Sequence, residues 1–563
     1  MHYAQLRQAR EELTGPGGQF EIVEQEVLGH KLRCFKNAPP SVREFWLSTA
    51  AYGDRTYLIY EGDRLTYAQA HAQANALAAW LAEQGVQPGD RVAIAMRNYP
   101  EWLVAYWSCV SCGIAVVGMN AWWTAEEMEY ALKDSQPKVL ICDSERLARF
   151  REIAANVPAV KLVGVRLNDY PADVTPWSVV ASHPGAMPQV AVDPDADACI
   201  FYTSGTTGFP KGAQLTHRGC IANLMNMLFA GASSAVALER AVGEVPPEVP
   251  PVPVVLLTTP LFHVTANNCG AYLTSAAGGT IVLMYRWDAG EALKLIEREK
   301  ISSVSGVPVM SRELINHPDF ATTDTSSLTG LSGGGAQVPP DLVLKIEEAV
   351  ATARPTTGYG MTETCGIITS VSGDFFVDRP DTAGPYMPSF DAKIVDDDGN
   401  ELPLGEVGEL WVKGSPVIKG YLNRPDATAQ TITDGWLHTG DVARMDEDKF
   451  IYIVDRKKDL VIRGGENISC TEVEACVYRH PAVAECCVFG VPDQRLGEEI
   501  GVAVVLKPGA TCTEAELQQH CLDHMSKHKV PRYVWFEAEA LPRNASGKFL
   551  RRELRDRLSA TVS

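Results

Sequence analysis

The sequence predicts a large α/β domain followed by a smaller α+β domain. The chain has 563 residues, more than a single hydrophobic core usually spans, so at least two domains are expected. Helical and strand patterns alternate up to about residue 455, an order typical of α/β folds with largely parallel sheets. The charge cluster "DRKKD" then interrupts the apolar pattern. We therefore predict a first domain over 1–455, a hinge over 456–460 and a second domain over 461–563.

In the first domain, helix-like segments precede strand-like ones. Residues 65–85 carry apolar side chains at helical spacing and end on a glycine, and residues 90–96 then form a short apolar run. The same order recurs where a helix at 289–300 precedes a strand at 301–309. Further apolar runs of strand length lie at 137–143 and 197–203. These repeats predict helices packed on a parallel sheet.

The second domain mixes both kinds of element without that strict alternation. Two segments have helical spacing, at 470–481 and 513–525. Two apolar runs, at 483–492 and 500–508, are typical of buried strands. This pattern predicts a small α+β domain.

Composition excludes several classes of function. The formal net charge is −20, and an acidic surface repels a polyphosphate backbone, so no nucleic-acid partner is expected. The 14 cysteines form no short disulfide framework, which favours a reducing compartment. The first residues lack the apolar segment of a signal peptide. We therefore expect a cytoplasmic protein.

The most apolar stretch, residues 102–120, is borderline in length for a membrane span. Serine, cysteine and glycine dilute it, so we predict a core helix that leads into a strand and no membrane span. Cys109 and Cys112 within it have C-x-x-C spacing but no second pair. A packed helix face therefore explains them better than a zinc or redox site.

The stretch "YTSGTTGFPKG" (residues 202–212) is rich in glycines and hydroxyls. It follows a predicted strand, and we expect it to lead into a helix capped by Thr216. A strand–loop–helix suits phosphate binding, because backbone N–H groups can approach the anion closely. A nucleoside-triphosphatase loop is ruled out, because Pro210 stands where its second glycine belongs and Gly212 where its hydroxyl belongs. Alone, the stretch fits a phosphate cradle or an exposed turn.

Five further motifs follow this loop in order: "PLFH" (260–263), "GYGMTE" (358–363), "HTGD" (438–441), "DRKKDLVIRGGENI" (455–468) and "PRNASGKFLRR" (542–552). The set resembles the adenylate-forming superfamily over roughly residues 40–555, and within it bacterial medium- and long-chain fatty-acyl-CoA ligases. The resemblance implies an ATP-dependent, AMP-forming acid–CoA ligase that uses Mg²⁺. It also implies a large domain of parallel-rich sheets with flanking helices and a small β subdomain, and a mobile C-terminal domain.

The expected chemistry begins with attack of a carboxylate on the α-phosphorus of ATP. The nucleophile is already ionised, so catalysis must come from positioning and from neutralising charge. The resemblance assigns Glu363 to Mg²⁺ and Thr362 to the α-phosphate, a carboxylate being a suitable ligand for this ion. It assigns Lys548 to the acid carboxylate and the bridging oxygen, and His263 to the flank of the acyl carboxylate. The β- and γ-phosphates would be held by Thr203, Ser204, Gly205, Thr206, Thr207, Gly208 and Lys211.

The resemblance also places the nucleoside and the acid. Tyr359 would stack on adenine, Asp441 would accept from the ribose hydroxyls, and Arg456 would lie on the ribose-phosphate side. The other residues expected near the nucleotide are Gly335, Ala336, Gly360 and Met361. The acid pocket is expected to be small or apolar, without a Lys or Arg that awaits a second carboxylate. Its expected lining is Val264, Asn268, Val307, Pro308, Met310 and Gly334.

In the second half-reaction a thiol attacks the acyl-adenylate. The resemblance implies that the small domain rotates about Lys458, and that Gly464, Gly465 and Glu466 line the pantetheine tunnel. No carrier segment follows the second domain in this sequence, so free CoA is the expected acceptor. Two alternatives remain open: a stand-alone adenylation protein that loads a carrier protein, and a nucleotide-binding regulator without catalysis. "PLFHVTANN" lacks the acidic residue that amino-acid-activating relatives use. A homodimer is expected only by analogy.

Overall fold

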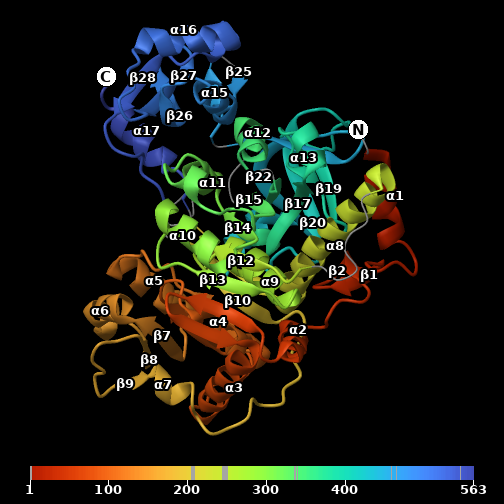
Figure 1. Cartoon of the computed structure of the whole chain (residues 1–563), viewed down its shortest axis with the longest axis vertical. Coiled ribbons are helices and arrows are strands. Elements are labelled where there is room, and N and C mark those ends of the chain that lie inside the picture. The colour runs from red at the N-terminus through yellow and green to blue at the C-terminus, as the bar shows by residue number, and fades with distance from the viewer. Residues whose placement is uncertain are drawn as a thin grey trace.

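The structure is a computed structural model that describes residues 3–203, 210–243, 251–334, 338, 340–350, 352–457, 459–463, 466–544 and 547–562. The described residues form two large sheets and three smaller ones. Figure 1 shows the two large sheets stacked in the lower and middle parts of the molecule, with the C-terminal part above them. This arrangement confirms the α/β class and the smaller second domain.

The first large sheet has the strand order β11-β10-β6-β5-β7-β8-β9. Neighbouring strands in this sheet are parallel, except for the antiparallel pair β10–β11. The strands are β5 (Arg91–Ala95), β6 (Ala115–Gly118), β7 (Val139–Asp143), β8 (Lys161–Val165), β9 (Val174–Pro176), β10 (Asp197–Thr203) and β11 (Lys211–Thr216).

The second large sheet has the order β17-β16-β15-β14-β12-β13-β3-β4. Its six inner strands are parallel, and the edge strands β4 and β17 are antiparallel to their neighbours. The strands are β3 (Thr56–Tyr60), β4 (Asp63–Thr66), β12 (Val254–Leu257), β13 (Thr280–Leu283), β14 (Ser303–Gly306), β15 (Gly330–Gly334), β16 (Arg354–Met361) and β17 (Gly366–Ser372).

Helices connect these parallel strands, as the alternating pattern predicts. Thr66 caps α3 (Tyr67–Glu83) through a capping box with Gln69, and Gly85 follows at φ 80°. The other helices of this part are α1 (Tyr3–Thr14), α2 (Val42–Ser48), α4 (Pro100–Ser111), α5 (Ala125–Ser135), α6 (Ser144–Ile153), α7 (Trp177–Val180), α8 (His217–Val242), α9 (Tyr272–Ala276), α10 (Ala289–Glu299), α11 (Pro308–Ile315), α12 (Pro340–Ala349), α13 (Asp374–Asp378) and α14 (Pro425–Thr431).

The apolar stretch 102–120 forms most of α4 and then β6, which confirms the predicted core helix leading into a strand. Cys109 and Cys112 are both buried there. Trp107 of α4 stacks on Trp46 of α2 with ring centroids 5.0 Å apart. Among the described residues, one helix is long and apolar enough to cross a membrane: α8, half of whose most apolar part lies inside the protein.

The structure corrects one expectation about the hydroxyl-rich loop. The segment after it, Lys211–Thr216, is strand β11 and pairs antiparallel with β10. Thr216 does cap α8, because its side chain accepts from the N–H of Gly219 at 3.0 Å. The motif is therefore strand–loop–strand–helix. The pairing with β10 is a tertiary interaction that overrides the weak local pattern of "KGAQLT".

Two further sheets complete the chain's main parts. A six-stranded antiparallel sheet forms the expected β subdomain, with β18 (Gly384–Pro385), β19 (Phe390–Val395), β20 (Gly408–Gly414), β21 (Ile432–Thr433), β22 (Trp436–Met445) and β23 (Phe450–Arg456). The C-terminal α+β part contains β24 (Val461–Arg463), β25 (Glu466–Ile468), α15 (Cys470–Val477), β26 (Val483–Asp493), β27 (Gly497–Leu506), α16 (Glu514–His524), β28 (Tyr533–Glu537) and α17 (Arg551–Ser559). A two-stranded hairpin, β1 (Ile22–Val27) and β2 (His30–Phe35), lies near the N-terminus.

Candidate active site

The ends of the hydroxyl-rich loop are held together by the β10–β11 hairpin. Thr203 and Lys211 are partners across the two strands, and Thr203 Oγ1 donates to the Lys211 carbonyl at 3.4 Å. Lys211 Nζ lies 4.6 Å from the ring centroid of Tyr421. The expected phosphate-binding residues Ser204, Gly205, Thr206, Thr207 and Gly208 lie outside the described residues.

Glu363 lies in a single helical turn, Thr362–Thr364, that follows β16. Its Oε1 accepts a hydrogen bond from the Tyr421 hydroxyl at 2.8 Å, and the residue is only 7% exposed. Burial and the nearby Glu363 raise the pKa of Tyr421, which therefore stays a neutral donor. Tyr421 thus lies between the ammonium of Lys211 and the carboxylate of Glu363. The motifs gave no signal for Tyr421, because its role depends on a contact between residues far apart in sequence.

The turn that carries Glu363 is fixed by close backbone packing against α8. Gly366 has φ 148°, and an added Cβ would lie 2.2 Å from Asn223 Oδ1. The same Oδ1 accepts from the Ile367 N–H at 2.8 Å. At Gly360 an added Cβ would lie 1.9 Å from the Gly366 carbonyl oxygen, so this glycine is required by strand packing. Thr362 and Met361, at the start of the turn, are half-buried.

Asp441 is held from two sides by residues of the predicted nucleotide set. It faces Arg456 across β22 and β23, with Arg456 Nε 3.5 Å from Asp441 Oδ1. Tyr359, on β16, donates its hydroxyl to Asp441 Oδ2 at 2.5 Å. Burial raises the pKa of Asp441, and Arg456, the Tyr359 hydroxyl and Lys548 oppose this rise. Tyr359 and Arg456, predicted from two separate motifs, therefore both contact the carboxylate of Asp441, which comes from a third motif.

His263 and Lys548 approach each other across the two domains. Burial, and then the positive charge of Lys548, lowers the pKa of His263 to about 4. His263 Nε2 is buried and has no hydrogen-bond partner among the described residues. The residue before Lys548, Gly547, lies against the large domain, because an added Cβ there would be 2.9 Å from Val307 Cγ2. The small domain is therefore seated with the segment that carries Lys548 at the site, where the charge of this lysine acts on His263 and Asp441.

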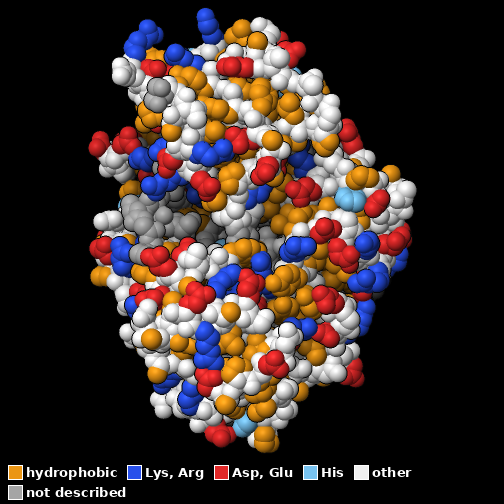
Figure 2. Space-filling view, turned by 90° about the vertical axis from the view of Figure 1, so that its left-hand side faces the viewer, with side chains coloured by type: hydrophobic (Ala, Val, Ile, Leu, Met, Phe, Trp, Pro, Cys, Tyr) orange, Lys and Arg blue, Asp and Glu red, His pale blue; other side chains and the backbone are white. Residues whose placement is uncertain are grey.

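The segment that carries Lys548 is braced within the small domain. The Lys548 N–H donates to Asn544 Oδ1 at 2.9 Å, and Arg543 Nη1 donates to the Gly547 carbonyl at 3.0 Å. Arg543 in turn pairs with Glu485 at 2.9 Å. Figure 2 shows the hollowed face between the small domain at the top and the large domain, with Lys and Arg side chains on both sides.

The low pKa of His263 leads to a prediction about the stability of the protein at acid pH. A histidine whose pKa is about 4 in the folded protein binds fewer protons than in the unfolded chain, so its contribution to stability is present above pH 6.5 and is lost as the pH falls toward 4. His263→Asn should therefore lose less thermal stability between pH 6.5 and 4.5 than the unmodified enzyme, by up to about 3 kcal/mol. The measurement is the thermal midpoint across this pH range.

His71 and His217 also have pKa values lowered to about 4 by burial, so part of the acid sensitivity should remain in that variant. His528→Asn, at an exposed position, serves as the control. If the thermal midpoint of His263→Asn fell with pH as steeply as that of the unmodified enzyme, the buried neutral state of His263 would be contradicted.

The expected acid-pocket residues lie at the ends of β12, β14 and β15. Val264, Val307, Pro308 and Met310 are buried. Met310 Sδ accepts from Thr258 Oγ1 at 3.0 Å. A Cβ added at Gly334 would meet only Thr265, at 3.7 Å, so one side of this glycine is open.

Asn268 differs from the other expected lining residues, because its side chain is held within the protein. It is fully buried and bonded to Asn267 and Cys220 at 3.0 and 3.4 Å. Glu466 is exposed at the start of β25. Lys458, Gly335, Ala336, Gly464 and Gly465 lie outside the described residues.

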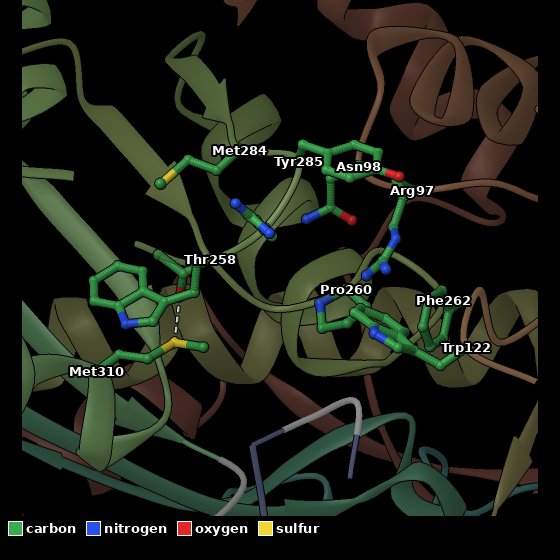
Figure 3. A pocket seen from close by; sticks show the side chains of 11 residues that line it. Arg97, Asn98, Trp122, Thr258, Pro260, Phe262, Met284, Tyr285 and Met310 are labelled. Carbon is green, nitrogen blue, oxygen red and sulfur yellow. Dashed lines mark hydrogen bonds between the residues drawn. The ribbon is translucent and has the colours of Figure 1, made fainter. Parts of the chain in front are cut away.

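Beside Met310 and the "PLFH" segment is a pocket of about 90 Å³ that the motifs did not predict (Figure 3). Its lining includes Arg97, Trp122 and Tyr285. Arg97 lies two residues beyond the end of β5, at the carboxyl ends of parallel strands where α/β proteins bind ligands. That position in the sequence is the signal that could have identified it.

The comparisons with known proteins agree with this geometry. The "AMP-binding enzyme" family model matches residues 45–422, and that of the "AMP-binding enzyme C-terminal domain" matches 472–548. A feruloyl-CoA synthase of Amycolatopsis sp is 36% identical over 510 residues, covering 89% of this chain and 96% of the relative. A long-chain-fatty-acid–CoA ligase of Bacillus subtilis is 33% identical over 538 residues, covering 90% and 92%.

Solved structures show the same fold. The anthranilate CoA ligase AuaEII in complex with anthranoyl-AMP has a TM-score of 0.83 and 26% identity, covering 93% of this chain and 98% of its own. The o-succinylbenzoate CoA synthetase of Bacillus subtilis, in complex with its acyl-adenylate, has a TM-score of 0.74 and 30% identity, covering 92% and 99%. The chain belongs to the AMP-binding enzyme family and is an AMP-forming acid–CoA ligase.

Proposed function

We propose that the enzyme adenylates a hydrophobic carboxylic acid, a medium- or long-chain fatty acid or another acid of similar polarity, and transfers the acyl group to CoA. The main support is the seating of the small domain: an added Cβ at Gly547 would lie 2.9 Å from Val307 Cγ2 in the large domain. The positive charge of the next residue, Lys548, acts on both His263, at the proposed acid site, and Asp441, at the proposed ribose site. The relatives' names, which include fatty-acid and feruloyl ligases, agree with a hydrophobic acid.

In the first step, an oxygen of the acid carboxylate attacks the α-phosphorus of ATP, and the bond to pyrophosphate breaks. The nucleophile is already an anion, so no residue needs to remove a proton. Lys548 reduces the repulsion between the two anions as they approach. His263 is neutral at pH 7, because its pKa is about 4, and therefore does not compete with Lys548 for the carboxylate.

Glu363 fits the role of a Mg²⁺ ligand. It is a nearly buried carboxylate with a hydrogen bond from Tyr421 that fixes its orientation. Groups of three or more His, Cys, Asp or Glu able to hold a metal ion are absent from the described part of the chain. A single carboxylate is nevertheless sufficient for Mg²⁺, which usually keeps several waters and takes its other ligands from substrate phosphates. When bound, the ion would neutralise phosphate charge.

In the second step, the thiol of CoA attacks the acyl carbonyl and AMP leaves. Lys548 must then withdraw so that the thiol can enter, and we propose the segment 456–460 as the hinge for this motion. The chain leaves the six-stranded sheet at Arg456 and enters the C-terminal sheet at Val461, so the proposed hinge lies between the two sheets. All 14 cysteines are free thiols, which agrees with a cytoplasmic location.

The substrate proposal predicts a steep dependence on chain length. Burial of each CH₂ contributes roughly 0.8 kcal/mol, so kcat/KM should rise along straight-chain acids at least to medium length. Gly334→Trp should shift the preference to shorter acids, because its side chain would fill the open side of this glycine. The measurement is acyl-CoA formation and pyrophosphate release over a panel of acids with free CoA.

Gly330→Ala, at the other end of β15, is the matched control, because its added Cβ would also meet only a small side chain, Ser303 at 3.3 Å. Acetate as the best acid would refute the substrate proposal. Adenylation without acyl-CoA formation would instead indicate an acceptor other than free CoA.

A further inference from the structure

The pocket of Figure 3 lies between the two large sheets at a position suited to ligands. In the first sheet, β5 has β6 on one side and β7 on the other. In the second, β12 has β13 on one side and β14 on the other. Parallel sheets form a crevice outside the carboxyl ends of their strands where the chain reverses its direction of winding. Arg97 and Asn98 follow β5, and Thr258 to Phe262 follow β12, so the pocket joins two such crevices.

Arg97, which lines this pocket, has two guanidinium donors without an acceptor. Its Nε and Nη1 atoms are buried and have no hydrogen-bond partner among the described residues. Buried donors without acceptors cost free energy, and few are retained unless something satisfies them. Figure 3 shows the Arg97 side chain extending toward the space between Asn98 and Trp122.

The acidic groups near Arg97 are committed to other partners. Both carboxylate oxygens of Asp143 accept from Arg146 Nη1 at 3.1 Å. From Arg97, Asp143 accepts the backbone N–H, at Oδ2 and 3.3 Å, and not the guanidinium. Glu145 pairs with Arg146 and Arg149. No ion pair of Arg97 occurs among the described residues, although the chain is strongly acidic.

Two aromatic rings hold the guanidinium of Arg97 in place. Arg97 Cζ lies 3.8 Å from the ring centroid of Trp122 and 5.1 Å from that of Tyr285. Such stacking positions a cation. The Tyr285 side chain also forms a hydrogen bond with Arg97, which leaves Nε and Nη1 as the donors without a partner among the described residues. Trp122 and Tyr285 are 43% and 37% exposed, so the pocket opens to solvent. Arg286, also exposed, lines the same pocket and makes no ion pair with a described residue.

We propose that this pocket, here called the Arg97 pocket, binds an oxyanion carried by one of the enzyme's own substrates. A guanidinium with free N–H donors recognises phosphate and carboxylate oxygens alike. The group is therefore a phosphate of the CoA nucleotide or a second carboxylate at the far end of the acid. This inference rests on the proposed acid–CoA ligase reaction, and it adds a specificity site to which no sequence motif pointed.

The experiment compares Arg97→Gln with the unmodified full-length enzyme on paired substrates. CoA, 3′-dephospho-CoA and pantetheine differ in their phosphates, and a monocarboxylic acid and an α,ω-dicarboxylic acid of equal length differ in the second carboxylate. Arg286→Gln repeats the test at an exposed position where folding is not at risk. Arg444→Gln is the matched control, because Arg444 is also half-buried and stacks on a tyrosine, 3.7 Å from the Tyr452 ring, but lies outside the pocket.

Arg97→Gln should lower kcat/KM by about tenfold for the substrate whose anion is bound, and leave its paired analogue nearly unchanged. A selective loss with CoA and not with pantetheine identifies the phosphate. A selective loss with the dicarboxylic acid identifies the carboxylate. Equal losses on all substrates, or no loss on any, would overturn the proposal and leave Arg97 a structural residue. Acyl-CoA formation by the unmodified enzyme tests the proposed function separately. The proposal about the pocket depends only on the ratio of kcat/KM between each variant and the unmodified enzyme.

Discussion

Lys548→Ala is expected to slow adenylate formation by about 10²–10³-fold, or ~3–4 kcal/mol, the scale for removal of one preorganised charge-stabilising donor. The physical reason is that two anions, the acid carboxylate and the α-phosphate of ATP, meet in this step. The charge of Lys548 acts on His263, at the proposed acid site, and on Asp441, at the proposed ribose site. Thioester formation from supplied acyl-adenylate should be largely retained, because the proposed hinge motion withdraws the lysine in that step. ATP–pyrophosphate exchange and single-turnover thioester formation measure the two halves.

Lys529→Ala is the control for this variant, because Lys529 lies in the same domain and pairs at 2.7 Å with Glu472, a residue of that domain. Lys548→Arg should restore part of the rate, since it keeps the charge but changes the shape of the donor. If Lys548→Ala slowed both half-reactions by the same factor, the lysine would be structural. The proposal that it acts in adenylation and not in thioester formation would then be wrong.

The fold was largely predictable, because its signals are local. Helical spacing ended by a glycine identified α3, and apolar runs identified β5, β7 and β10. Strand β11 was missed, because "KGAQLT" has no strong period of its own and is a strand through its pairing with β10. Strand pairing is a tertiary property that local pattern cannot supply.

The candidate site was predictable only where residues stand in motifs. Tyr359, Asp441 and Arg456 come from separate motifs, and the structure brings them within contact distance. Tyr421 and Arg97 were missed for different reasons. Tyr421 acts through a hydroxyl that reaches Glu363, 58 residues away. Arg97 is distinguished by two buried guanidinium donors, Nε and Nη1, that have no hydrogen-bond partner among the described residues, and this is visible only after folding.

Gly547→Ala is expected to lower adenylate formation by about 10–100-fold, or ~1.4–2.7 kcal/mol. Gly547 has φ +81°, and its added Cβ would lie 2.9 Å from Val307 Cγ2 in the large domain. The left-handed backbone costs an alanine about 1–2 kcal/mol, and the contact with Val307 would push the small domain away. Because Lys548 is the next residue, this displacement removes its charge from the site. ATP–pyrophosphate exchange is the measurement.

The two causes of this loss can be separated. Gly509 also lies in the small domain at φ +77°, but an added Cβ there meets nothing within 4 Å. Gly509→Ala should therefore lower stability without slowing adenylation. Val307→Ala should partly rescue Gly547→Ala, because it removes the contact but not the backbone strain. Thioester formation from supplied acyl-adenylate should be nearly unaffected, since the proposed rotation of the small domain would move Gly547 away from Val307. Failure of the rescue, together with equal loss in both half-reactions, would show that Gly547 serves folding and not the seating of Lys548.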